Sequence, residues 1–108
     1  MRRWNGWGDE ATVVELPAHG EAFLAALVGS GQALPDASLE QVLAQVPASR
    51  LRAPHPLVSV DGEVRVRHAR GQSLPDWLAM RSGDFGLFPD GVALPESVEQ
   101  IRELLSWA

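Results

Sequence analysis

A serine followed three positions later by Gln or Asp recurs at three places in this 108-residue chain. The three pairs are Ser38 with Gln41, Ser73 with Asp76, and Ser97 with Gln100. In such a capping box, the serine hydroxyl and the second side chain each accept a hydrogen bond from a backbone N–H that would otherwise lack a partner at the start of a helix. We therefore predict that helices begin just after these three serines.

The residues that follow the caps have the spacing of helices that bury one face. Apolar side chains fall three and four residues apart after each serine. They are Leu39, Val42, Leu43 and Val46 before Pro47; Leu74, Trp77 and Leu78 before Gly83; and Val98, Ile101, Leu104 and Leu105. A further helix is predicted over residues 20–29, where Phe23, Leu24, Leu27 and Val28 share a face. We expect Leu74, Trp77 and Leu78 to point inward.

A β-hairpin is predicted over the segment LVSVDGEVRVRH, residues 57–68. Asp61 and Gly62 suit a two-residue turn, because both tolerate the positive φ that such turns require. Val58 and Val60 alternate with polar residues before the turn, as Val64 and Val66 do after it. Two short strands are also predicted, at 12–16 and 92–94.

Composition limits the classes of partner. The chain carries a net charge of -5, and all nine of its basic residues are Arg. An acidic chain is poorly suited to phosphate backbones, so we expect no nucleic-acid partner. No Cys is present, which excludes disulfides and thiolate sites. The longest apolar run, residues 22–28, is far shorter than the roughly 20 residues of a membrane span, and no signal peptide is evident, so a cytoplasmic protein is expected.

No catalytic, cofactor-binding or metal-binding residue is predicted within the chain. His19, His55 and His68 are too far apart in sequence to suggest a metal site, and we expect all three to be partly exposed polar residues. Ser73 lacks the G-x-S-x-G context of a nucleophile and suits a helix cap.

Two groups of residues leave alternatives open. Arg65, Arg67 and Arg70 would either steer an anion or form the solvated face of the hairpin, and the second is the commoner arrangement. Trp4 and Trp7 either lie buried in a turn or form an aromatic surface for a partner or second domain.

Four short motifs occur in order along the chain. They are W-x-G-W-G (Trp4, Gly6, Trp7, Gly8), R-G-x-S-x-x-D (Arg70, Gly71, Ser73, Asp76), R-x-G (Arg81, Gly83) and P-D-x-V-x-x-P (Pro89, Asp90, Val92, Pro95). Together they resemble the N-terminal part of bacterial FAD-binding oxidases related to alkyldihydroxyacetonephosphate synthase, within the vanillyl-alcohol-oxidase-type flavoprotein family.

The resemblance implies an α+β fold in which a small helical cap with a β-hairpin precedes the first strand–helix unit of the FAD domain. Residues 1–88 would form the cap region, and residues 89–108 would begin an incomplete FAD-binding domain. The glycine-rich loop that grips the FAD pyrophosphate would follow this segment in the family. FAD is therefore expected in the parent enzyme and no cofactor in this segment alone, with the remainder of the enzyme chain as its partner and a homodimer possible.

The family includes a synthase, which exchanges an acyl group for a long-chain alcohol, and oxidases, which move a hydride from a 2-hydroxy acid to the flavin. No residue of this chain chooses between them. The alternative from a different class is a free-standing protein-interaction module anchored by Trp4 and Trp7.

Overall fold

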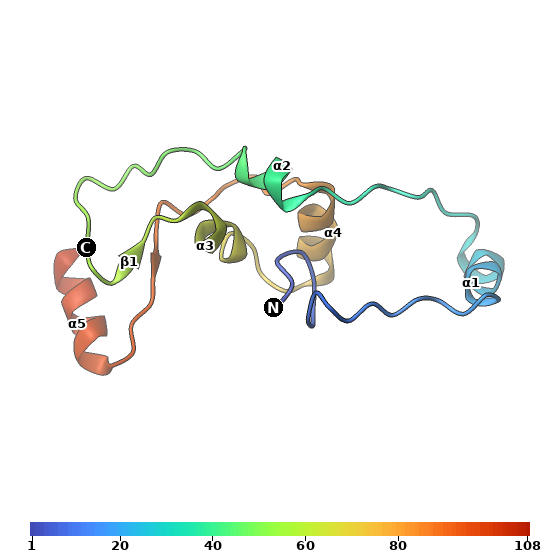
Figure 1. Ribbon diagram of the computed structural model, residues 1–108, viewed down its shortest axis with the longest axis horizontal. Helices are drawn as coiled ribbons and strands as arrows, with labels where there is room; N and C mark the ends of the chain where they lie inside the picture. The colour runs from blue at the N-terminus through green and yellow to red at the C-terminus, as the bar shows by residue number, and fades with distance from the viewer.

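Five helices and two short strands follow one another along residues 1–108 of the computed structural model (Figure 1). In chain order they are α1 (Gly20–Val28), α2 (Leu39–Leu43), β1 (Val58–Ser59), α3 (Gly62–Arg67), α4 (Leu74–Ser82), β2 (Val92–Ala93) and α5 (Val98–Trp107). The mixture of helices with a small antiparallel sheet confirms the α+β class.

The serine caps lie where the sequence predicts them. The Ser38 hydroxyl accepts from the Gln41 backbone N–H at 3.1 Å, and the Gln41 side chain accepts from the Ser38 N–H at 2.8 Å. A second complete capping box joins Ser73 and Asp76. α2 is shorter than predicted, because Gln45 and Val46 bond back three residues in tighter turns and the α-helix ends at Leu43.

The third cap is only half of a capping box. The Ser97 hydroxyl accepts from the Gln100 N–H at 3.2 Å, as predicted. The Gln100 side chain, however, accepts from the Glu96 N–H and not from that of Ser97. One side-chain bond is therefore enough to begin α5.

The predicted β-hairpin is wrong, because residues 62–67 form helix α3. Asp61 serves as the N-cap of that helix, its carboxylate accepting from the Val64 N–H at 3.0 Å. Glu63 and Arg67, one helical turn apart, form an ion pair at 2.6 Å that supports the helix further. β1 pairs instead with β2, in antiparallel register with Val58 opposite Ala93.

The predicted strand at residues 12–16 is also absent. This segment is extended but lies beside no partner strand, so no ladder of hydrogen bonds forms. It belongs to a long arm, residues 12–36, which carries α1 at its tip, far from the rest of the molecule (Figure 1).

A small core lies where α2, α3 and α4 meet. It consists of four buried side chains, with Trp4, Trp77 and Phe88 among the half-buried residues packed against it. The four are Val42, Val66, Met80 and Phe85. Contrary to prediction, Leu74 and Leu78 are each 64% exposed, because Met80 and Trp77 turn the other side of α4 towards the core.

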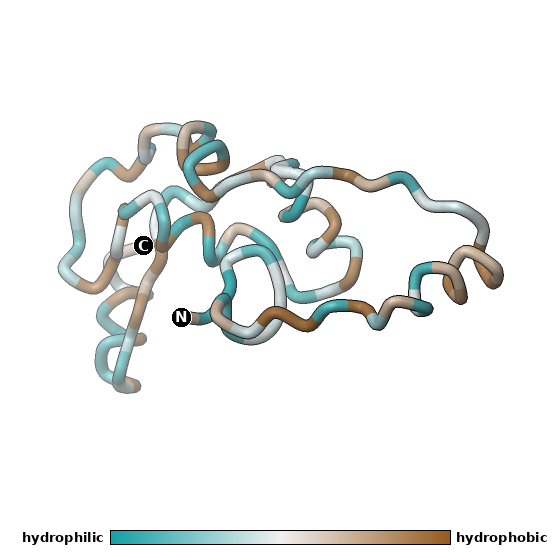
Figure 2. Tube along the Cα trace, turned by 45° about the vertical axis from the view of Figure 1, so that its right-hand side comes forward, coloured by the Kyte–Doolittle hydropathy of each residue, from teal (hydrophilic) through white to brown (hydrophobic).

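The molecule is far more open than a self-contained domain of its size. Its radius of gyration is 18.2 Å, whereas a compact chain of this length has about 13 Å. Its accessible surface is 8219 Å², against roughly 5,900 Å² for a compact protein of this mass. Much of the additional surface is apolar, and Figure 2 shows hydrophobic colour along the outlying arm.

Candidate functional site

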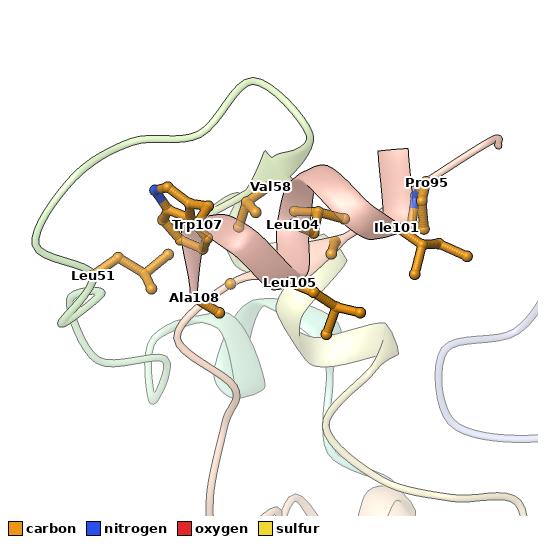
Figure 3. Close-up of a pocket in the computed structure, with 10 residues that line it drawn as sticks. Leu51, Val58, Pro95, Ile101, Leu104, Leu105, Trp107 and Ala108 are labelled. Atoms are coloured by element: carbon orange, nitrogen blue, oxygen red, sulfur yellow. The ribbon is translucent and has the colours of Figure 1, made fainter. Parts of the chain in front are cut away.

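An apolar groove lies between α5 and the β1–β2 ribbon (Figure 3). Its cavity measures about 320 Å³, and eight of its ten lining residues are hydrophobic. The principal side chains are Leu51, Val58, Ile101, Leu104, Leu105 and Trp107. The groove is thus suited to apolar side chains rather than to a charged ligand.

The apolar stripe of α5 faces this groove, but its side chains are not fully covered there. Ile101 remains 46% exposed and Leu105 74% exposed, as expected for a stripe that lacks part of its packing surface. The stripe lies beside Leu51 and Val58. At the floor, Gly91 allows close approach, since a Cβ there would lie 2.6 Å from Val58 and 2.9 Å from Leu51.

His55 fastens the end of α5 to the preceding connector. Its side chain is only 8% exposed, although the residue as a whole is partly exposed, as predicted. Nδ1 accepts from the Leu57 N–H at 3.2 Å, which places the proton on Nε2, 3.3 Å from the Glu103 carboxylate. The ring also lies 5.0 Å from that of Trp107. Each of these contacts positions α5.

The other two histidines lie elsewhere. His19 and His68 are exposed, and a ring nitrogen of His68 lies 2.7 Å from the Val64 carbonyl in α3. Residues 1–108 contain no group of three metal-ligating side chains close enough to hold an ion.

Arg65 is buried and ties together two distant parts of the chain. The residue is 3% exposed, where a position on a solvated hairpin face was predicted. Its Nε donates to the Pro89 carbonyl at 2.6 Å and its Nη1 to the Pro47 carbonyl at 2.7 Å, while Nη2 is buried without a partner. Since α3 replaces the predicted strand, Arg65 points into the molecule.

The neighbouring arginines also bond within the chain. Arg67 pairs with Glu63 and donates to the Arg2 carbonyl at 2.7 Å. Arg70 donates to the carbonyls of Asp84 and Phe85, each at 3.1 Å. The anion-steering alternative is therefore not supported by their placement.

Asp90 of the P-D-x-V-x-x-P motif joins the two connectors that lead to the groove. Both its carboxylate oxygens accept from the Arg50 guanidinium, at 2.8 to 3.1 Å, and one also accepts from the Arg50 backbone N–H. These hydrogen bonds, together with the positive charges of Arg50 and the nearby Arg65, hold the pKa of Asp90 below its ordinary value.

The R-G-x-S-x-x-D motif forms a local cap. The Ser73 hydroxyl bonds to the Asp76 carboxylate and is the main cause of the lowered pKa of Asp76, with Arg70 contributing from 3.7 Å. Gly71 allows the backbone to lie close to the Asp76 side chain, because a Cβ at this position would lie 2.9 Å from an Asp76 carboxylate oxygen. Each residue of the motif therefore has a structural explanation.

Trp4 and Trp7 divide between the two alternatives. Trp4 is half-buried and stacks on Phe85, with the ring centroids 6.1 Å apart. Trp7 is 62% exposed and meets Trp77 edge to face. Beside this pair lies a cavity of about 300 Å³, whose lining includes Arg3, Val13 and Arg81. Sequence alone could not separate the two indoles, because both lie in the same short turn.

No helix in residues 1–108 is both long and apolar enough to cross a bilayer. No protein-family model matches the chain, and a search of curated proteins finds no match.

A solved structure, described as alkyldihydroxyacetonephosphate synthase in P1, is similar in fold, with a TM-score of 0.63 and 21% sequence identity. The similarity covers 96% of this chain but 25% of the synthase chain. This chain thus spans a quarter of the length of the structure that it matches, and what it shares with that structure is the fold.

Proposed function

We propose that this chain is the N-terminal region of an FAD-dependent oxidoreductase or alkyldihydroxyacetonephosphate-synthase-like flavoenzyme of vanillyl-alcohol-oxidase type. Residues 1–88 form its cap region, and residues 89–108 begin its FAD-binding domain. The pyrophosphate-binding loop and the catalytic residues lie in other parts of the enzyme. Which of the two chemistries the enzyme performs is decided by those parts.

The observation that carries the proposal is the open shape of the chain combined with its fold similarity. Almost the whole chain, including its outlying arm, aligns with one quarter of a much longer enzyme. Its accessible surface of 8219 Å² exceeds the compact value by roughly 2,300 Å². A standard interface removes only about 800 Å² from each partner. A larger body that covers this excess accounts for both facts.

The residues of this chain do not fit FAD by themselves. A pyrophosphate needs several backbone N–H groups or cations converging on it. The groove beside α5 is lined mainly by apolar side chains. One of its two non-hydrophobic positions is Gly91, against which the side chains of Val58 and Leu51 already pack closely. We therefore assign no step of a flavin reaction to any residue of this chain.

The proposal is tested by purifying the protein from its source cells through a tag at the N-terminus. We expect a polypeptide several times heavier than 11.7 kDa that shows the absorption bands of flavin. The 108-residue chain expressed alone is expected to bind no FAD in equilibrium dialysis. A natural product of 11.7 kDa without flavin, or tight FAD binding by the short chain, would refute the proposal.

The exposed Trp7 supports a second candidate, a protein-interaction module. Its indole is 62% exposed on the edge-to-face pair with Trp77, and exposed tryptophans are common anchors at interfaces. Trp4 does not share this role, because it packs on Phe85. A natural 11.7 kDa protein that binds a partner and loses it on Trp7→Ala would favour the module over the enzyme.

A further inference from the structure

Helix α1 is apolar around its whole circumference, yet nothing covers it. The seven residues from Ala22 to Val28 are all hydrophobic, and no residue of the helix is buried. Phe23 is 61% exposed, Leu27 65% and Val28 81%. A helix of this kind is normally enclosed by other parts of a protein.

The arm that carries α1 is attached to the body only at its two ends. Between residues 13 and 35 every hydrogen bond is local to the arm. At one end Arg3 donates to the Thr12 carbonyl at 2.6 Å. At the other, Arg81 pairs with Asp36 at 2.8 Å and its carbonyl accepts from the Ala37 N–H. Both attachments lie beside α4, and the tethers between them and α1 have no regular structure.

The outer face of α4 is an apolar surface that also lacks a partner. Leu74 and Leu78, one helical turn apart, are each 64% exposed, and Ser82 continues the same row. A cavity of about 160 Å³, lined in part by Leu34 and Leu78, lies between this face and the arm. α1 and α4 are both nine residues long, so one helix can cover the other along its length.

We propose that the arm is a movable strap, and that in the free chain α1 closes onto the outer face of α4 in the same molecule. The tethers, residues 12–19 and 29–36, are eight residues each and can span up to about 26 Å. Gly29 and Gly31 provide the backbone freedom for the bend, and Gly29 already has a positive φ of 89°. The extended position shown in Figure 1 is the open state of the strap.

We expect α1 to dock on α4 of its own molecule and not on α4 of a second copy, because the tethers hold the two helices at a high effective concentration. Short flexible tethers give an effective concentration in the millimolar range, about a thousandfold above a micromolar protein solution. This inference concerns the chain by itself, and it is tested separately from the proposed flavoenzyme, in which a larger body would cover the same apolar surface.

Small-angle X-ray scattering of the 108-residue chain gives the first test. We expect a monomer whose radius of gyration falls well below the open value of 18.2 Å, towards the compact value of about 13 Å. The double variant Leu74→Glu with Leu78→Glu is expected to return towards the open value. The control Leu87→Glu, at a residue 87% exposed outside α4, should behave like the parent chain. A parent chain that scatters as an open monomer would overturn the strap.

Disulfide cross-linking gives the second test, because the chain has no native Cys that could form competing disulfides. Ala26→Cys combined with Ser82→Cys should form a disulfide within one monomer under mild oxidation. Ala26→Cys combined with Ser106→Cys on α5 should not. A disulfide that joins two chains in the first variant would overturn closure in favour of exchange between copies. Equal cross-linking in both variants would show that α1 has no preferred docking site and would also overturn it.

Discussion

The Arg50 guanidinium donates to both carboxylate oxygens of Asp90, forty residues further along the chain, and the Arg50 backbone N–H donates one more hydrogen bond to the same carboxylate. This ion pair joins the two chain segments that lead into the β1–β2–α5 unit. Arg50 directly precedes Leu51, and Asp90 directly precedes Gly91, and both of these residues line the groove.

Replacing Asp90 by Asn should weaken the chain and change its response to acid. Because the pKa of Asp90 in the folded chain lies below its ordinary value of 3.8, the ionised carboxylate stabilises the fold above that value. This stabilisation disappears as the pH falls through the lowered pKa. In urea unfolding we expect Asp90→Asn to lower the midpoint at neutral pH and to reduce the loss of stability below about pH 4. The control Asp84→Asn, an exposed carboxylate without a side-chain partner, should leave both unchanged.

Removing the guanidinium of Arg65 should be among the most costly single changes. Arg65→Leu would leave the Pro47 and Pro89 carbonyls without their donors in a partly buried site. Each lost partner costs about 1–3 kcal/mol, so the loss of two predicts a decrease of about 2–6 kcal/mol in the free energy of unfolding. Arg52→Leu, at an exposed arginine without a hydrogen bond, should change it by less than about 0.5 kcal/mol. Equal effects of the two changes would contradict this role for Arg65.

Adding one methyl group at Gly91 should disrupt the groove. The Cβ of Gly91→Ala would lie 2.6 Å from the Val58 Cγ1 and 3.3 Å from the Ser59 carbonyl oxygen. Overpacking of this kind costs about 1–3 kcal/mol. Gly31→Ala, where a Cβ meets nothing within 4 Å, should be neutral or stabilising by about 0.4–1 kcal/mol. Thermal unfolding of the two variants side by side decides the matter.

The Ser73 hydroxyl should control the titration of Asp76. It is the largest cause of the lowered pKa of that carboxyl, ahead of the charge of Arg70. In Ser73→Ala the pKa of Asp76 should rise towards 3.8, and α4 should lose about 0.5–2 kcal/mol with its cap. Carboxyl chemical shifts followed by NMR through an acid titration would show the change. An unaltered titration curve would mean that the hydroxyl is not needed and that the Ser73 backbone N–H and Arg70 suffice.

The parts of the fold that the sequence predicts well are those determined within one helical turn. The serine caps depend on side chains three residues apart, and the structure forms them at Ser38, Ser73 and Ser97. The wrong prediction of a β-hairpin at residues 58–67 also has a physical cause that acts within one helical turn. Asp61 can serve a tight turn or an N-cap, and the Glu63–Arg67 spacing, which favours the helix, was the signal that distinguishes them.

What the sequence could not predict depends on distant partners. The pairing of Val58 with Ala93, the burial of Arg65 against Pro89 and the enclosure of His55 by α5 all join segments that no local pattern connects. For the same reason, the stretch at residues 12–16 has the β-branched composition of a strand but forms no strand, because composition does not supply a neighbour.

The antiparallel pairing of Val58 with Ala93 has a consequence for synthesis on the ribosome. α2 and α3 can form and meet as soon as residue 67 has left the exit tunnel, since their contacts are local in sequence. β1 must wait until Ala93 emerges, with the Leu51 and Val58 side chains unshielded in the meantime. Slower translation while residues 68–93 emerge from the tunnel would therefore prolong the interval in which the nascent chain needs a chaperone.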